Sequence, residues 1–150
     1  MFFLDTNIYI AAFNEPDFGA EFSVFHRDHL PRLLLSAVVA HELMIGARTP
    51  DRRRKLQRGL LEPFRTRGRI HVPTLATWEV AADLNRRLRE AGGCEGSLTQ
   101  RSFGNDLLLA ASARELGALI ITRNLADFER IGRVVALKFA APWPELQVPG

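Results

Sequence analysis

Short apolar runs alternate with longer amphipathic stretches along the chain. The compact runs are rich in large aliphatic and aromatic residues and predict buried strands at residues 2–4, 33–35, 70–72, 119–121 and 134–139. The longer stretches carry apolar residues at helical spacing and predict helices at residues 8–13, 22–30, 38–47, 51–64, 74–91, 102–117 and 126–131. Strands that alternate with helices favour a parallel sheet covered on both faces. We therefore expect an α/β fold with one domain over residues 1–150, a three-layer α/β/α sandwich with a mostly parallel central sheet.

Small polar residues mark the starts of several predicted helices. The Thr6-Asn7 pair is expected to cap the first helix, and Thr74 or Thr77 a later one. Two stretches are expected to be irregular, the polar loop 95–101 and the tail 142–149. The Arg-rich stretch 51–64 is expected to turn Leu56, Leu60, Leu61 and Phe64 inward. The stretch 74–91 carries its apolar residues at helical spacing: Trp78, Val80, Ala81, Leu84 and Leu88.

Composition narrows the class of protein. An apolar fraction of 47% is that of a globular domain, and no apolar run is long enough to cross a bilayer. The single cysteine, Cys94, falls in a predicted loop and cannot form an internal disulfide, which agrees with a reducing compartment. No basic stretch followed by a signal-like apolar segment stands at the N-terminus. We therefore expect a cytoplasmic protein with no membrane association.

Positive charge is concentrated in the middle of the chain. The net charge is only +3, but basic residues crowd residues 48–69: Arg48, Arg52, Arg53, Arg54, Lys55, Arg58, Arg65, Arg67 and Arg69. Such a density either follows a phosphate backbone or forms a solvated helix face, and the patterning alone leaves both interpretations open.

Acidic side chains stand near the ends of the predicted strands and at the starts of the helices beyond them. They are Asp5, Glu42, Asp106 and Asp127. Because the carboxyl ends of parallel strands share one edge of a sheet, we expect these acids to converge. Two carboxylates about 4 Å apart repel by roughly 4 kcal/mol at an effective dielectric constant near 20. Three of them therefore demand a cation.

The donor types decide which cation and which chemistry fit. Carboxylate oxygens favour Mg²⁺ or Mn²⁺, and no cysteine–histidine set is present that would favour zinc. A hard ion in such a pocket polarises a scissile phosphate and lowers the pKa of a bound water molecule. The predicted chemistry is metal-assisted hydrolysis of a phosphodiester bond.

Four groups of residues occur in a specific order: Leu4-Asp5-Thr6-Asn7, Ser36 with Glu42, Asn105-Asp106 followed by Ala110-Ala111-Ser112-Ala113, and Thr122-Arg123-Asn124 with Asp127-Phe128. This order resembles that of the PIN-domain ribonucleases, most of all the VapC toxins of bacterial toxin–antitoxin systems. The resemblance implies a Mg²⁺- or Mn²⁺-dependent endoribonuclease that cleaves structured RNA, tRNA in particular. It also implies a homodimer and a cognate antitoxin whose C-terminal segment lies across the active site.

Carried over residue by residue, the resemblance implies that Asp5, Glu42 and Asp106 are the catalytic, metal-binding acids. Asn124 is a further catalytic candidate, at a position where many relatives carry a fourth acid. Its amide brings no charge, which puts a second metal ion in doubt. Asp127 is expected either to reach the metal shell or to cap the following helical turn. The residues expected to orient the acids or a water molecule are Thr6, Asn7, Ser36 and Thr122.

Basic and aromatic residues receive less specific roles. Arg123 is expected either to contact RNA phosphate or to pair with the acid cluster. Arg48 and Arg52 are further candidates for RNA contact. Trp78 and Trp143 are expected to be core or interface residues rather than platforms on which bases stack.

Two other functions stay open and a third is rejected. A structure-specific DNA nuclease would use the same acidic pocket, although this chain lacks the long insertions that thread a flap. A catalytically weak RNA-binding module would suit the missing fourth acid. A response-regulator-like phosphoacceptor domain needs an acceptor aspartate at the end of the third strand, where this chain has Pro73.

Overall fold

The structure, a computed structural model, describes residues 1–93 and 95–144, so the predictions for Cys94 and for residues 145–149 lie outside it. Its centre is a five-stranded sheet of parallel strands in the order β3-β2-β1-β4-β5. The strands are β1 (Phe2–Leu4), β2 (Leu33–Ser36), β3 (Ile70–His71), β4 (Leu119–Ile121) and β5 (Phe139–Ala140). The chain runs outward from β1 to β3 and then crosses to β4 on the other side of β1. This reversal between β1 and β4 is where open α/β sheets bind ligands.

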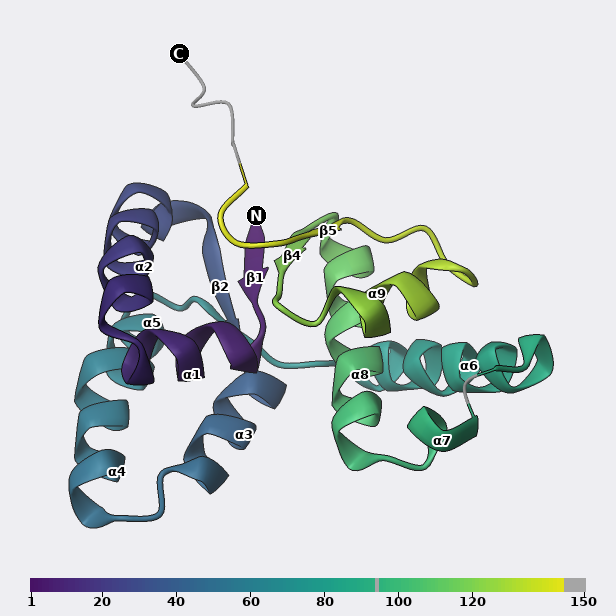
Figure 1. The fold of residues 1–150 in the computed structure, drawn as a ribbon, viewed down its shortest axis with the longest axis horizontal. Helices are drawn as coiled ribbons and strands as arrows, with labels where there is room; N and C mark the ends of the chain where they lie inside the picture. Colours follow the sequence, from purple (N-terminus) through teal and green to yellow (C-terminus); the bar gives the residue numbers. More distant parts are fainter. Residues whose placement is uncertain (94, 145–150) are drawn as a thin grey trace.

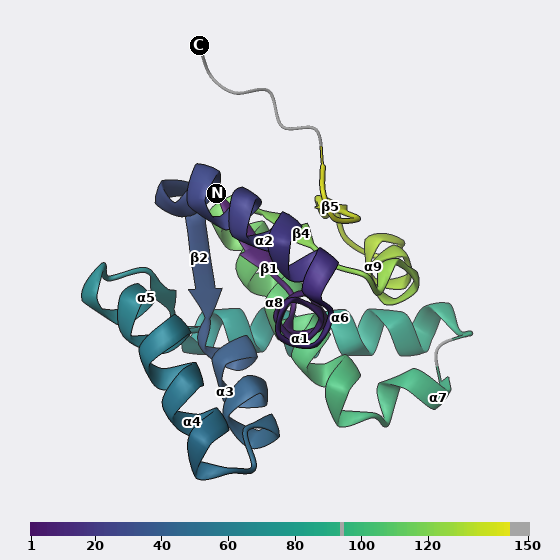
Figure 2. The same cartoon turned by 60° about the vertical axis from the view of Figure 1, so that its left-hand side comes forward.

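Helices cover both faces of the sheet. They are α1 (Thr6–Asn14), α2 (Pro16–His29), α3 (Ala37–Gly46), α4 (Pro50–Leu56), α5 (Glu62–Thr66), α6 (Leu75–Ala91), α7 (Glu95–Leu98), α8 (Arg101–Leu116) and α9 (Leu125–Gly132), with a 3-10 turn, η1 (Leu30–Arg32), before β2. In Figures 1 and 2, α2 lies on one face of the sheet and α8 on the other, and α6 packs against α8. The predicted α/β/α sandwich is confirmed. No helix among the described residues is long and apolar enough to cross a bilayer.

The central strands are buried on both sides. Phe3 on β1 pairs in register with Leu34 on β2 and with Ile120 on β4. Phe3 and Ile120 are fully buried, and burying a side chain of this kind is worth about 1.5–3 kcal/mol. Because neither face of the sheet meets water, these strands are continuous apolar runs rather than alternating ones. For this reason the predicted bounds of β1, β2 and β4 agree with the observed bounds to within one residue.

Helix α1 begins at Thr6, which is earlier than predicted. Its N-cap is Asp5, which precedes the Thr6-Asn7 pair that was expected to cap it. The backbone of Asp5 is extended, and its side-chain Oδ1 accepts a hydrogen bond from the Thr6 backbone N–H at 2.7 Å. Thr6 and Asn7 are the first residues of the helix, so the expectation that they cap it is wrong. Aspartate is as good a cap as asparagine and better than threonine, and it comes first. At α6, Thr74 is the cap, in reciprocal hydrogen bonds with Thr77.

The predicted Arg-rich helix is continuous but has a wider turn in its middle. Helix α4 passes into a π-helical turn, η2 (Gln57–Leu61), and then into α5. Pro63 has no N–H to donate to the carbonyl four residues back, and just before it the Glu62 N–H donates to the Gln57 carbonyl five residues back. The four apolar residues expected to face inward are all buried: Leu56, Leu60, Leu61 and Phe64.

Two predictions in the second half of the chain are wrong. The stretch 95–101 was expected to be a loop but contains the single-turn helix α7. The strand expected at 134–139 is reduced to the two residues of β5. The Val134 N–H still closes a turn with the Ile131 carbonyl at 3.1 Å, so hydrogen bonding to β4 begins only at the Lys138 carbonyl.

The segment that leads into α6 is more exposed than predicted. Val72 lies beyond β3, and Trp78 and Val80 lie on the outer side of α6, with exposed fractions of 66%, 54% and 37%. Trp78 is therefore no core residue. Trp143 does pack inside, stacked on Phe25 with ring centroids 4.7 Å apart. The buried side of α6 consists of Thr77, Ala81, Leu84 and Leu88.

A buried hydroxyl on α1 leads to a stability prediction. Tyr9 is fully buried against Phe22, and among the described residues its hydroxyl has no hydrogen-bond partner. An unpaired buried polar group costs about 1–3 kcal/mol. We expect Tyr9→Phe to raise the free energy of unfolding by about 1 kcal/mol, measured by urea denaturation. A destabilised Tyr9→Phe protein would show that the hydroxyl has a bonding partner in solution.

Candidate active site

Asp5 is the centre of a hydrogen-bonded cluster at the carboxyl end of β1. Its Oδ2 accepts hydrogen bonds from Asn7 Nδ2 and from Thr122 Oγ1, both at 2.7 Å, and its Oδ1 accepts the α1 cap bond from Thr6. Only 5% of Asp5 is exposed. Burial raises the pKa of this carboxyl group, and the hydrogen bonds from Thr122 and Thr6 act in the opposite direction. The orienting roles predicted for Thr6, Asn7 and Thr122 agree with these contacts.

Glu42 reaches the same region from the second turn of α3. Its Oε2 accepts a hydrogen bond from Thr6 Oγ1, and its Oε1 accepts one from Asn105 Nδ2 at 2.8 Å. Thr6 therefore contacts Asp5 through its backbone and Glu42 through its side chain. Asn105 was not among the predicted site residues, and its position beside Asp106 was the signal available in the sequence.

Asp106 stands on α8 close to the other acids. Burial, with a smaller contribution from the neighbouring carboxylates of Asp5, Asp127 and Glu42, raises the pKa of Asp106 to about 8. The structure thus brings the four predicted acids near one another, although Asp5 and Asp127 lie near opposite ends of the sequence. Within residues 1–93 and 95–144, no three of these side chains lie close enough together to hold one ion as they stand.

The loop after β4 supplies the uncharged side of the site. Asn124 donates its backbone N–H to Thr122 Oγ1 at 2.9 Å and its side-chain Nδ2 to Asp127 Oδ2 at 2.6 Å. Asn124 occupies the N-cap position of α9, and Asp127 lies in the first turn. The alternative in which Asp127 caps this helix is therefore wrong. Asp127 instead contacts Asn124 and Arg130.

Two predicted site residues have other partners. Ser36 is fully buried and caps α3 by accepting a hydrogen bond from the Val38 N–H at 3.2 Å. Arg123 does not pair with the acid cluster: its guanidinium forms two hydrogen bonds with Glu15, at 2.7 and 2.8 Å, and lies over the Phe18 ring. Glu15 was missed because nothing in the local sequence relates it to a residue more than a hundred positions away.

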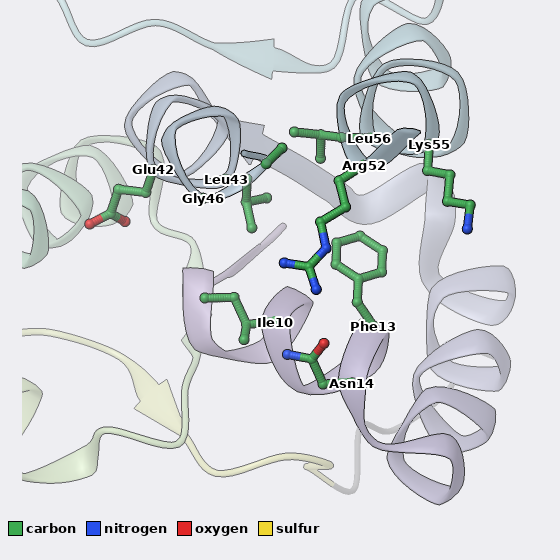
Figure 3. Close-up of a pocket in the computed structure, with 10 residues that line it drawn as sticks. Ile10, Phe13, Asn14, Glu42, Leu43, Gly46, Arg52, Lys55 and Leu56 are labelled. Atoms are coloured by element: carbon green, nitrogen blue, oxygen red, sulfur yellow. The ribbon is translucent and has the colours of Figure 1, made fainter. Parts of the chain in front are cut away.

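A groove of about 510 Å³ begins beside Glu42 and runs between α1, α3 and α4 (Figure 3). Apolar side chains form most of it, and Arg52 and Lys55 line it from α4. The lining residues are Ile10, Phe13, Asn14, Glu42, Leu43, Gly46, Ala47, Arg52, Lys55 and Leu56. Arg48 is exposed just before α4 and is not part of this lining.

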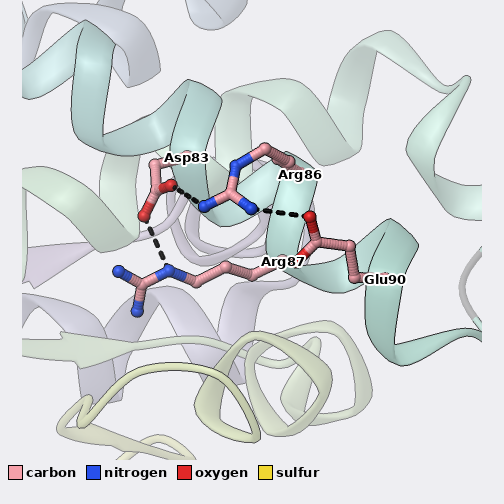
Figure 4. Close-up of polar contacts among 4 residues, drawn as sticks. All are labelled: Asp83, Arg86, Arg87 and Glu90. Carbon is pink, nitrogen blue, oxygen red and sulfur yellow. Dashed lines mark hydrogen bonds and ion pairs between the residues drawn. The ribbon is translucent and has the colours of Figure 1, made fainter.

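Basic side chains on α4 and α6 differ in their pairing. On α6, Arg86 contacts Asp83 and Glu90, and Arg87 contacts Asp83, all at 2.6 Å (Figure 4). On α4, Arg54 and Lys55 contact Asp51 at 3.7 and 3.1 Å, whereas Arg52 takes part in no ion pair with any described residue. Arg52 therefore offers the groove a positive charge that no described acid neutralises.

The donor set fits a hard divalent cation. The acidic side chains near one another are carboxylates, with the amide of Asn124 beside Asp127, and oxygen donors of this kind suit Mg²⁺ or Mn²⁺. Burial raises the pKa of Asp106 most, and the like charges of its neighbours raise it too; a bound cation would relieve that repulsion. Asp5, Glu42 and Asp106 are the residues that would hold it.

The fold and the site together define an α/β domain with a cluster of acidic side chains where the strand order of a parallel sheet reverses. The chain belongs to the PIN-domain family, whose family model matches residues 2–134. This span includes all the acids of the cluster, and PIN domains are typically nucleases. No curated relative matches the sequence.

Solved structures of toxin–antitoxin proteins share this fold. A FitAB complex bound to an IR36 DNA fragment is 19% identical, with 98% of this chain and 99% of that chain covered and a TM-score of 0.72. FitAcB from Neisseria gonorrhoeae is 21% identical, with coverage of 97% and 100% and a TM-score of 0.66. VapBC-1 from nontypeable Haemophilus influenzae is 23% identical, with coverage of 93% and 96% and a TM-score of 0.62. At these identities the likeness establishes the fold.

Proposed function

We propose that this chain is a Mg²⁺- or Mn²⁺-dependent endoribonuclease and the toxin of a toxin–antitoxin pair. The observation that carries the proposal is that Asp5 and Glu42, from distant elements, lie near enough to Asp106 to contribute to its raised pKa of about 8. Membership in the PIN-domain family supports a nuclease, and the oxygen-only donor set supports a hard metal ion.

In this proposal the chain's own residues hold the ion and place the substrate. Asp5, fixed by its three hydrogen bonds, would hold the ion together with Glu42 on α3 and Asp106 on α8. The ion supplies a water molecule of lowered pKa and polarises the scissile phosphate. Arg52 lines the groove next to Glu42 and is placed to bind a phosphate of the RNA backbone, with Arg48 just outside it. Arg123, which is paired with Glu15, is the least available of the three predicted RNA contacts.

Cleavage of total RNA, with and without a chelator and with the cut ends mapped by sequencing, tests this function. We expect discrete cuts that need a divalent metal and vanish with chelator. Cleavage of branched DNA but not of RNA would favour the structure-specific DNA nuclease. Binding of RNA without any cleavage would favour the weak RNA-binding module, for which the uncharged Asn124 is the relevant observation.

We further propose that an antitoxin segment occupies the groove of Figure 3. Exposed Ile10 and Phe13, together with Leu43, give the groove an apolar wall, and Glu42 at its end offers a negative group. An amphipathic helix with a basic residue near its C-terminus matches both features. The similar solved structures are complexes of FitA with FitB and of VapB with VapC, which supports such a partner.

Phe13→Asp is expected to weaken the toxin–antitoxin complex by at least tenfold, because it places a charge in the apolar groove. The measurement is calorimetry, and the partner to use is the product of a small open reading frame found directly upstream of this gene. Val24→Asp changes an equally exposed apolar residue on α2, outside the groove lining, and is expected to leave binding unchanged. Equal binding by Phe13→Asp and the parent protein would rule out this groove as the contact.

A homodimer is also proposed. Val72, Leu75 and Trp78 are more than half exposed around the start of α6, and a self-associating surface would cover them. Light scattering measures the mass directly, and a monomer at all concentrations would contradict this part of the proposal.

A further inference from the structure

The side-chain amide of Asn124 has a defined orientation. Its Nδ2 lies 2.6 Å from Asp127 Oδ2, and a carboxylate only accepts hydrogen bonds, so the nitrogen and not the oxygen must face Asp127. The backbone of Asn124 is held as well, because its N–H donates to Thr122 Oγ1, and that hydroxyl donates to Asp5. Among the described residues, Asn124 Oδ1 accepts no hydrogen bond. This oxygen belongs to the same loop as Thr122, whose hydroxyl contacts both the Asn124 backbone and Asp5.

Asp127 is itself fixed from the other side. Its Oδ1 accepts a hydrogen bond from Arg130 Nη1 at 2.9 Å, and the same nitrogen donates to Ser97 Oγ on α7 at 2.8 Å. Both carboxylate oxygens of Asp127 are therefore engaged, one by Asn124 and one by Arg130. The side chain is only 23% exposed, so water competes weakly for these bonds.

We propose that Asp127, held by Arg130 and Ser97, is a positioning residue that presents Asn124 Oδ1 as the uncharged oxygen ligand of the metal site. This inference rests on the proposed metal dependence. It replaces both roles that the sequence left open for Asp127, a metal ligand or a helix cap. An amide at position 124 contributes an oxygen without adding a further negative charge beside Asp5, Glu42 and Asp106.

The inference is tested by calorimetric titration of Mn²⁺ into the full-length protein. We expect Asn124→Ala and Asp127→Ala each to weaken binding by about tenfold, and the double variant to be no weaker than either single one. Glu129→Ala removes an exposed carboxylate from the same helix and is the matched control for lost charge. The paired substitution Asn124→Asp with Asp127→Asn restores a hydrogen bond with the donor reversed, and we expect it to restore binding.

Arg130→Met separates positioning from charge. Removing a positive charge near the pocket would by itself strengthen the binding of a cation, whereas loss of positioning weakens it. We expect Arg130→Met to bind Mn²⁺ several-fold more weakly than the parent protein. If the parent binds and Arg130→Met binds equally or more tightly, positioning by Asp127 is refuted. If the parent protein itself binds no Mn²⁺, the metal-dependent function fails instead, and circular dichroism of each variant identifies any that has lost its fold.

Discussion

Asp5→Asn is expected to abolish RNA cleavage while the chain stays folded. The substitution keeps the size of the side chain and the α1 cap, because an asparagine oxygen still accepts from the Thr6 N–H. It removes the charge from the centre of the acid cluster and, with the oxygen kept on the Thr6 N–H, places an amide nitrogen where Asn7 and Thr122 now donate. We expect activity to fall by more than about 100-fold, the upper end of what loss of a supporting partner costs a metal site.

The matched control is Asp17→Asn, which changes an exposed aspartate in the first turn of α2 and is expected to retain full activity. Cleavage is measured on the RNA cut by the parent protein, at saturating Mn²⁺ and with the fold checked by circular dichroism. A folded Asp5→Asn protein that cuts at the parent rate would remove Asp5 from the mechanism.

Stability without metal is expected to fall as the pH rises from about 4 to 8, and a divalent cation is expected to restore it. The pKa of Asp106 is about 8 in the folded chain and near 4 when unfolded, so the folded state holds a proton that the unfolded state releases. Folding is therefore favoured below this window and loses that contribution as the pH rises through the folded pKa. The raised pKa of Asp5 acts in the same direction.

At pH 8 the addition of Mg²⁺ at about 100 times its dissociation constant stabilises the fold by about 2.7 kcal/mol, which corresponds to a rise in Tm of about 5–10 °C. Thermal melts at several pH values, with and without Mg²⁺, measure both effects. Asp106→Asn should flatten the pH dependence and reduce the effect of Mg²⁺, whereas Asp17→Asn should change neither. If the Tm of the parent protein changes neither with pH nor on addition of Mg²⁺, the result would contradict a metal-binding acid cluster.

The parts of the fold that the sequence predicted are those with a strong local pattern. Strands β1, β2 and β4 are apolar runs because both faces of the sheet are covered, and Leu56 and Phe64 keep helical spacing through the π-turn. The convergence of Asp5 and Asp106 followed from topology, since strand ends in a parallel sheet share an edge. Membership in the PIN-domain family, expected from the motif order, is confirmed.

The parts that sequence could not predict depend on partners far away along the chain. The Arg123–Glu15 pair joins the loop after β4 to the start of α2 and carries no local signal. The bounds of strand β5 depend on which residues can form hydrogen bonds with β4. The apolar pattern at 134–139 contains no information about that pairing. The Thr6-Asn7 pair was expected to cap α1, but Asp5 caps it and also stands at the centre of the acid cluster, so one side chain performs two tasks.

The order in which the acids occur along the chain has a consequence for synthesis. Asp5 and Glu42 come early, but Asp106 and the Thr122 hydroxyl that bonds Asp5 come late. A ribosome adds residues from the N-terminus onward, and the sheet needs β4 beside β1 before its centre is complete. A half-translated polypeptide therefore lacks Asp106 and Thr122, and the acid cluster can assemble only after the residues of β4 and the loop beyond it have been added.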